Sequence, residues 1–213
     1  MKFRLVFAVL MIASLSAFSQ AEKRINVYSA YVFDDKFETV NSTTDYYRGK
    51  IIGGYQWGAG LEFLIKEQIS AELMYLHQDT QAPVDYYNFG NTARTYDVGV
   101  SYAMLGLSRV MKKDKVEPYG GLLLGAAIFN NKTPNPGEET SKVKFALGFR
   151  LGATVWVSDR VGIKLQTQFI TSVQGIGGGF YFGTGGASAG ASTYSTITQF
   201  TLGGGLAFKL GAQ

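Results

Sequence analysis

The chain has 213 residues, a formal net charge of only +4 and no cysteine. So small a charge gives no ground for nucleic-acid binding, and without cysteine there is no disulfide, thiolate metal site or cysteine nucleophile. The length fits a single domain, and the 27 glycines beside 15 phenylalanines and 13 tyrosines are an abundance that its fold has to explain.

Residues 1–19 predict a secretory signal peptide. Lys2 and Arg4 precede an uncharged apolar run, and the small residues Ala17 and Ser19 follow it. This is the pattern of an export signal cleaved after Ser19, and the run is too short for a transmembrane helix, which needs about 20 apolar residues. The domain is then expected to span 20–213.

After the signal peptide, apolar and polar residues alternate with a period of two, which is typical of strands with unlike faces. In one clear case Ile163 and Leu165 alternate with Lys164 and Gln166. The pattern predicts eight strands, at 24–33, 49–65, 69–78, 94–110, 117–130, 142–157, 161–174 and 194–210. Short connections alternate with long ones, and the long ones are 34–48, 79–93, 131–141 and 175–193.

The polarity of the two faces distinguishes a soluble sandwich from a membrane barrel. One face is large and aromatic, whereas the other carries glycine, alanine, serine, glutamine and a few charges. Such small residues suit the narrow interior of an eight-stranded barrel, and the apolar face suits lipid. The sequence therefore predicts an all-β, eight-stranded antiparallel up-and-down transmembrane β-barrel, whose closure satisfies every backbone group.

The last strand carries a more specific pattern, in which Thr201, Gly203, Leu206 and Phe208 combine a polar residue, a glycine and alternating apolar residues. With this strand and its architecture, the chain resembles the small outer-membrane barrels of the OmpA/OmpX type, of the porin family or outer-membrane β-barrel domain. The resemblance implies that these four residues form the assembly signal. It also implies periplasmic short turns, outer long loops, a Gram-negative outer-membrane location, and lipopolysaccharide, other outer-membrane lipids and the assembly machinery as partners.

The glycine-rich stretch 175–193 matches neither common phosphate-loop pattern, since it has no lysine, and is expected to be the fourth outer loop. Aromatic residues recur in three of the outer loops. The tyrosine pairs of the first two loops predict either a contact surface for an extracellular ligand or rings anchored at the headgroups, and the aromatic triplet of the fourth loop is expected to form either the loop tip or an inward-folded plug. These residues are Tyr46, Tyr47, Tyr86, Tyr87, Phe180, Tyr181 and Phe182.

Two sets of charges are candidate sites. The first is expected to pair inside the lumen and comprises Glu62, Glu72, Arg109, Arg150 and Lys164. The second is expected at the outer rim, where it either holds anionic lipid phosphates or is simply solvated, and comprises Arg48, Lys50, Arg94, Lys142 and Lys144.

His77, the sole histidine, is expected on the lipid-facing side near the outer rim. Lipid A deacylases carry a serine two residues after such a histidine, whereas here Asp79 follows, so we expect no enzyme. We also expect no metal, no cofactor and no nucleic-acid partner, and a monomer. The hypothesis is a structural or surface-interaction protein with a filled lumen, the alternative is a narrow channel for small solutes, and a lipid-modifying enzyme ranks third.

Overall fold

The structure is a computed structural model and describes residues 22–40, 46–65, 68–86, 92–132, 140–173, 179–183, 186–190 and 197–211. The predicted signal peptide lies outside these residues. Within the described ranges, no helix is long and apolar enough to cross a bilayer.

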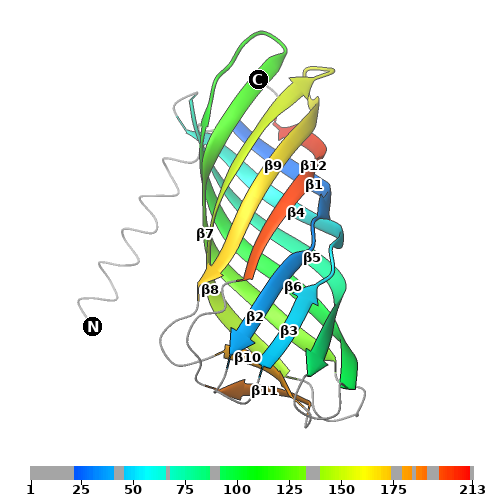
Figure 1. The fold of residues 1–213 in the computed structure, drawn as a ribbon. Coiled ribbons are helices and arrows are strands. Elements are labelled where there is room, and N and C mark those ends of the chain that lie inside the picture. Colours follow the sequence, from blue (N-terminus) through cyan, green and yellow to red (C-terminus); the bar gives the residue numbers. More distant parts are fainter. Residues whose placement is uncertain are drawn as a thin grey trace, which may run out of the picture.

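The described elements are β-strands (Figure 1). In chain order they are β1 (Glu22–Val32), β2 (Asp35–Val40), β3 (Tyr46–Ile51), β4 (Gly54–Ile65), β5 (Ile69–Tyr86), β6 (Thr92–Val110), β7 (Val116–Lys132), β8 (Thr140–Trp156), β9 (Val161–Val173), β10 (Gly179–Gly183), β11 (Gly186–Gly190) and β12 (Ile197–Leu210).

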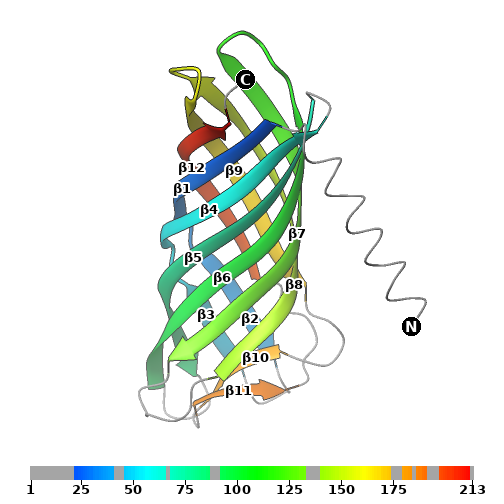
Figure 2. The ribbon, with the colours of Figure 1, turned by 180° about the vertical axis from the view of Figure 1, so that it is seen from behind.

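The strands close into an antiparallel barrel in up-and-down order, seen from both sides in Figures 1 and 2. β1 and β2 are two halves of the first barrel strand, and β3 and β4 are two halves of the second. The last strand, β12, pairs with β1 from Lys23↔Leu210 to Val32↔Thr201, which closes the circle. The predicted eight-stranded barrel is therefore confirmed.

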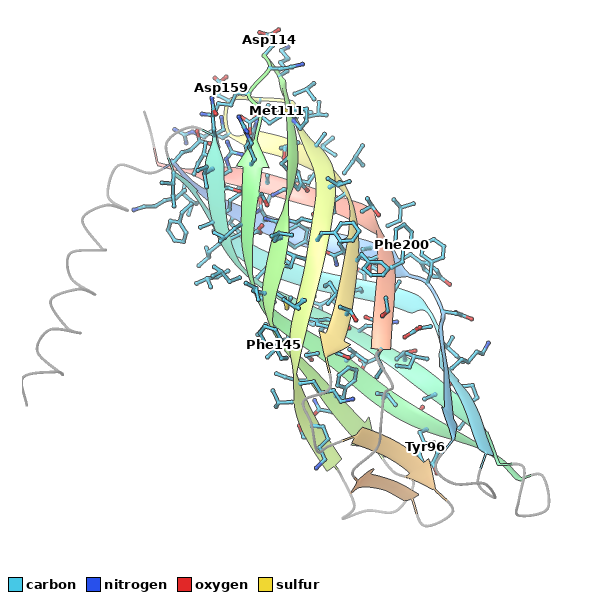
Figure 3. The ribbon with its side chains drawn as sticks, turned by 60° about the vertical axis from the view of Figure 1, so that its left-hand side comes forward. Tyr96, Met111, Asp114, Phe145, Asp159 and Phe200 are labelled. Carbon is cyan, nitrogen blue, oxygen red and sulfur yellow. The ribbon has the colours of Figure 1, made fainter. Side chains whose placement is uncertain are left out.

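The two ends of the barrel differ. At the turn end, the connections β4–β5, β6–β7 and β8–β9 are short, and Asp114 (φ 46°) takes the left-handed conformation that aspartate tolerates in a tight turn. At the loop end, residues 41–45, 87–91 and 133–139 join β2 to β3, β5 to β6 and β7 to β8, and the much longer stretch 174–196 joins β9 to β12. In Figure 3, Met111, Asp114 and Asp159 mark the turn end, and Tyr96 lies toward the loop end.

The predicted facing of the strands is correct wherever a period-two pattern was assigned. On β9, Leu165 is 60% exposed on the outside, whereas its neighbour Lys164 is 2% exposed and points into the lumen. Leucines on the other strands form an outward apolar belt around the barrel. The belt includes Leu61, Leu73, Leu105, Leu124, Leu147, Leu165 and Leu202. In water such a belt would be a large exposed apolar patch, so it belongs against hydrocarbon.

Strands β5 and β6 are longer than predicted. Their ladder runs without a break from Ile69↔Arg109 to Tyr86↔Thr92, so most of the expected loop 79–93 is strand. β5 has 18 residues and β6 has 19, against about 9–11 needed to cross a bilayer. The prediction failed because it followed the apolar face, which ends near Gln78, while the backbone ladder continues beyond it.

The polarity of the two faces inverts along β5 and β6. As far as His77 and Ser101, which pair with each other, the outward face of both strands is predominantly apolar. Beyond that pair, we define residues 78–86 and 92–100 as the projecting segment. Its outward residues include Asp79, Gln81, Thr95 and Asp97, whereas Ala82, Tyr96, Val98 and Val100 are buried inside. The projecting segment thus has an apolar core and a polar surface, as a water-soluble barrel does.

The fourth long connection is not wholly irregular. Within the predicted loop 175–193, β10 and β11 pair antiparallel from Gly179↔Gly190 to Gly183↔Gly186 and form a separate two-stranded sheet. Figure 1 draws this hairpin at the loop end of the barrel. Its glycines are compatible with this pairing, because glycine weakens a strand but a tight hairpin tolerates it.

The inversion of polarity predicts where a charge is tolerated on the outside of β5. Leu73→Arg places a cation in the middle of the apolar belt and is expected to lower the free energy of unfolding by about 2–4 kcal/mol. Gln81→Arg, on the same face of the same strand, is expected to cost less than about 0.5 kcal/mol because it lies in the polar projecting segment. Unfolding titrations in lipid vesicles measure both, and equal costs would contradict the assignment of the belt.

Candidate functional site

Two buried ion pairs occupy the lumen on the turn-end side. Arg150 Nη1 lies 2.5 Å from Glu72 Oε2, and both side chains are fully buried. Lys164 Nζ lies 3.1 Å from Glu62 Oε2, again with both groups buried. The four side chains come from β4, β5, β8 and β9, so the pairs join strands that are distant around the barrel wall. Removing charges from water costs several kcal/mol per ion, and such close pairing offsets that cost.

Neutral side chains connect the two pairs into one network. Asn26 Nδ2 donates to Glu62 at 3.0 Å and to Glu72 at 2.8 Å, which holds the two carboxylates apart. The Tyr28 hydroxyl donates to Glu72, and Arg150 Nε donates to Ser108 Oγ at 3.1 Å. Each carboxylate therefore accepts several charge-assisted hydrogen bonds, which are stronger than neutral ones.

A third ion pair lies closer to the turn end. The Arg24 guanidinium donates to both oxygens of Glu117, at 2.7 and 3.3 Å, and lies 4.8 Å from the Trp156 ring. The sequence interpretation did not include Arg24 and Glu117. Their signal was present, because Arg24 shares its parity with Asn26 and Tyr28, which point inward. It was missed because no facing was assigned to the first strand.

Glutamines fill the next layer of the lumen toward the loop end. Gln168 Nε2 donates to Gln56 at 3.1 Å, and Gln199 Nε2 donates to Gln78 at 3.2 Å. The Tyr102 hydroxyl donates to Gln199 at 2.8 Å. Beside them lie buried apolar side chains, such as Leu76, Leu123 and Phe129, so polar and apolar groups share this part of the lumen.

Arg109 does not belong to the lumen network, and its assignment there is wrong. Ser108 and Val110 are buried inside, so Arg109 between them points outward and is exposed. Its position explains why a charge is tolerated on the apolar side. It pairs with Ile69 at the turn-end limit of the belt, where a long side chain reaches interfacial water.

The five rim cations do not form one outward patch. Lys144 is buried in the lumen with Nζ 5.5 Å from the Phe129 ring, and Lys142 shares its parity, so neither is an outer lipid contact. Lys50 faces outward, 3.4 Å from Asp34. The side chains of Arg48 and Arg94 lie outside the described residues. The grouping failed because it considered height along the barrel and ignored which face each residue occupies.

The predicted loop aromatics lie mostly on strands, but their side chains are outside the described part. Tyr46 and Tyr47 belong to β3, where Tyr47 pairs with Tyr86 of β5. Phe180, Tyr181 and Phe182 belong to β10, and Tyr87 lies outside the described residues. Of the four predicted assembly-signal residues, Thr201 and Gly203 face the lumen, whereas Leu206 and Phe208 face outward. Their role in assembly stays a prediction.

His77 is half-buried on the outer wall, as expected from its parity, and it has a serine partner that the sequence pattern did not reveal. Its Nδ1 lies 2.8 Å from Ser101 Oγ on β6, and its Nε2 lies 3.4 Å from Asp79. Tyr75 donates to the same Ser101 oxygen at 3.1 Å. The serine was missed because it comes from the neighbouring strand. No group of three or more histidines or carboxylates within the described ranges is arranged to hold a metal ion.

Comparisons with known proteins agree on the fold. No family model matches this chain, and no curated protein matches it by sequence. Among solved structures, it is similar to the outer membrane protein OprG of Pseudomonas aeruginosa (12% identity, 90% of this chain and 97% of that one, TM-score 0.61). It is also similar to Neisserial surface protein A, with 12% identity over 88% of this chain and 97% of that one and a TM-score of 0.57. A third similar structure is the outer membrane protein AlkL in lipid bilayers, with 14% identity over 92% of this chain and 94% of that one and a TM-score of 0.53. The chain therefore has the fold of the small outer-membrane β-barrels.

The paired charges predict an asymmetric response to mutation. Arg150→Met leaves Glu72 buried without its cation and is expected to destabilise the barrel by about 3–5 kcal/mol. Adding Glu72→Gln to that variant is expected to restore much of the loss, because no lone charge then remains. Arg109→Met is the matched control and is expected to cost less than about 0.5 kcal/mol, since Arg109 is exposed. A double-mutant cycle in lipid vesicles that gave no coupling would contradict the pairing.

Proposed function

We propose that this chain is an integral barrel of a Gram-negative outer membrane, with a closed lumen and a function exerted at its loop end. In this proposal the turn end faces the periplasm and the loop end faces the outside. The belt contacts outer-membrane lipids, among them lipopolysaccharide, and the barrel is inserted as a monomer by the assembly machinery. The similar solved structures support the location through their shared fold.

The observation that carries the closed lumen is the burial of the ion pairs. The side chains of Glu72 and Arg150 have no exposed surface, and they reach each other from β5 and β8, which lie on different parts of the wall. An interior of eight strands is just wide enough to be filled by side chains. The apolar side chains nearer the loop end, including Tyr96, Val98 and Val100, add a second layer that resists hydrated ions.

The projecting segment supports a surface-interaction role. A barrel that served only to span the bilayer would need strands of about 9–11 residues, yet β5 to β8 have 17 to 19. The additional length carries its own apolar core, so it is a rigid platform that raises the long connections above the lipid. Binding residues are commonly presented on loops that such a scaffold positions.

A narrow channel for small solutes is the second candidate. Several buried polar atoms of the lumen have no hydrogen-bond partner in the described structure, among them Asn26 Oδ1, Gln56 Nε2 and Arg150 Nη2. Buried polar groups of this kind are commonly satisfied by water, so water in the lumen would favour this alternative.

Single-channel recording on the purified barrel in planar bilayers separates the two candidates. The wild-type protein is expected to give no discrete conductance steps. A variant in which Glu62, Glu72, Arg150 and Lys164 are alanine, together with the large apolar-layer residues Tyr96, Tyr102 and Phe129, is expected to conduct, provided that it still shows heat-modifiable migration on gels, because both layers that close the lumen have then been removed. Discrete steps from the wild-type protein would instead support the channel.

Replacing residues 175–193 by a short glycine–serine turn tests the role of the loop end. The turn end and the barrel ladder are left intact, and β10–β11 belong to a separate sheet, so heat-modifiable migration and stability are expected to persist. Protease added to intact cells is expected to cut the wild-type chain within this stretch and to leave the shortened variant uncut, because the proposal places the loop end outside. Failure of this variant to assemble would contradict the independence of the hairpin from the barrel.

A further inference from the structure

Three features follow one another on the outer wall along β5 and β6. An apolar groove lies in the belt, a cluster of hydrogen-bonding side chains lies at the edge of the belt, and a polar depression lies just above it. On β5 the sequence is Leu73, Tyr75, His77 and Asp79 from turn end to loop end. A membrane phospholipid has the same order of parts, from acyl chain through ester linkages to headgroup.

The groove has a volume of about 630 Å³, which is within the range of sites for small ligands. It forms because alanines interrupt the bulky outer face. Ala59 and Ala103 stand in register on either side of Tyr75, and larger side chains border them toward the turn end. These larger residues are Ile25, Leu61, Leu73, Leu105 and Leu124. The groove faces the hydrocarbon that surrounds the belt, so an acyl chain is the occupant at hand.

The boundary cluster consists of Trp57, Tyr75, His77 and Ser101. The His77 ring lies 5.6 Å from the Trp57 ring and stacks on that of Tyr75, with 6.4 Å between centroids. The Tyr75 hydroxyl and His77 Nδ1 both reach Ser101 Oγ, so three polar groups converge at the edge of an apolar surface. Amphipathic rings are favoured at this depth of a bilayer, where the ester groups of lipids lie.

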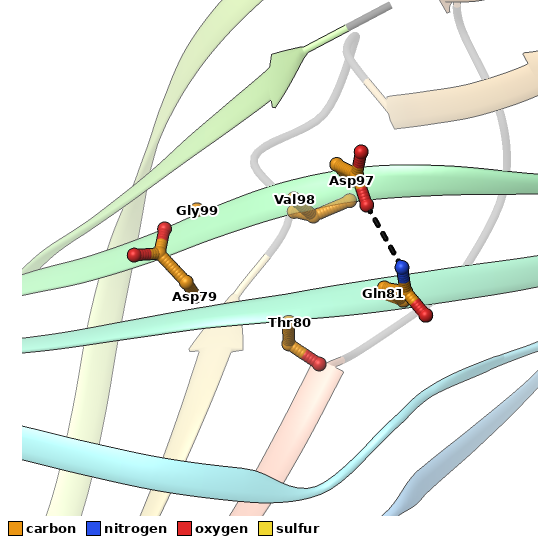
Figure 4. A pocket seen from close by; sticks show the side chains of 6 residues that line it. All are labelled: Asp79, Thr80, Gln81, Asp97, Val98 and Gly99. Carbon is orange, nitrogen blue, oxygen red and sulfur yellow. Dashed lines mark hydrogen bonds between the residues drawn. The ribbon is translucent and has the colours of Figure 1, made fainter.

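The depression has a volume of about 320 Å³ and opens where Gly99 lacks a side chain (Figure 4). Asp79 and Asp97 line it together with Gln81, whose Nε2 donates to Asp97 at 3.0 Å. Asp79 is 74% exposed, which places a carboxylate directly above the cluster. Two carboxylates repel a headgroup whose net charge is negative and attract an ammonium group.

We propose that the outer wall of β4, β5 and β6 is a binding site for one phospholipid with an ammonium-bearing headgroup. The acyl chain lies in the groove over Ala59 and Ala103, the ester region meets the boundary cluster, and the ammonium group lies beside Asp79 and Asp97. The site lies at the loop-end edge of the belt, so in the proposed orientation its phospholipid competes with the lipopolysaccharide of the outer leaflet, whose phosphates the two carboxylates repel. The site does not depend on whether the lumen conducts.

Hydrolysis of the lipid is less well supported than binding. Ser101, His77 and Asp79 stand in the order of a nucleophile, a base and an orienting carboxylate. However, Ser101 is only 4% exposed, and its strand pairs on both sides, with β5 and β7. The neighbouring amides are therefore committed to the ladders and are not free to bind a developing oxyanion.

The chain carries its own probe for this site. It has two tryptophans, and Trp156 is buried near the turn end, so Trp156→Phe leaves Trp57 beside the cluster as the only one. This protein is reconstituted in phosphatidylcholine vesicles with a minor fraction of phosphatidylethanolamine brominated on its acyl chain, which quenches tryptophan fluorescence on contact. The quenched fraction of Trp57 fluorescence is expected to be at least about threefold greater than the mole fraction of the brominated lipid, because a binding site holds that lipid more often than random contact does.

Matched variants in the Trp156→Phe background decide the assignment. Ala103→Leu fills the groove, so the quenched fraction is expected to fall to the mole fraction of the brominated lipid. Ala153→Leu, on the outward face of β8, is expected to leave the quenched fraction unchanged. Asp79→Asn with Asp97→Asn is expected to remove the preference over brominated phosphatidylglycerol. Quenching equal to the mole fraction in the starting protein, or equal effects of the two leucines, would overturn the site. Release of free fatty acid from the vesicles would contradict a site that only binds lipid, and would point to Ser101 as a nucleophile.

Discussion

The structure depends on one constraint, which is that a backbone surrounded by hydrocarbon must satisfy its hydrogen bonds within itself. The unbroken ladder from β1 to β12 and back to β1 meets this requirement, because a closed barrel has no edge strand. Closure then forces each strand to present one face to lipid and the other to a narrow interior. The abundance of glycine follows from that geometry, since at Gly121, Gly125 and Gly205 a side chain would collide with the backbone of an adjacent strand.

The same geometry explains how far the sequence could be interpreted. The two faces of a strand differ strongly in the belt, so the facing of Leu165 and Lys164 could be predicted from alternation alone, and with it the barrel. Partners in space could not be predicted. The bond between Arg150 and Glu72 depends on which strands face each other across the lumen, and the bond between His77 and Ser101 depends on the register of β5 and β6. Alternation excludes a register shifted by one residue, because every side chain would change face, but it does not distinguish registers that differ by two residues.

The failures at Arg109 and Lys144 both concern the side of the wall, which depends on parity. Arg109 was expected inside although no alternation had been assigned to its strand, whereas Lys144 was grouped by its height along the barrel although its alternation with Val143 and Phe145 indicates the lumen. A shift of a single residue moves a side chain from lipid to lumen, so Arg109 lies outside although Ser108 faces the Arg150 guanidinium. The extended ends of β5 and β6 were not predicted for a related reason. Above the belt the outward face does not have to be apolar, so the apolar pattern ends before the strands do.

The inversion of polarity divides one continuous ladder between two solvents. In the belt the lumen must accept polar groups, because the apolar residues are required outside, and buried charges are tolerated only as close pairs such as Lys164 with Glu62. Above the belt water covers the outside, so apolar residues such as Tyr96 and Val98 move to the interior. The boundary between these regimes, at His77 and Ser101, is the place where a polar cluster on the outer wall contacts both solvents. An amphiphile is complementary to this boundary, because there an apolar groove and exposed carboxylates adjoin on the same two strands.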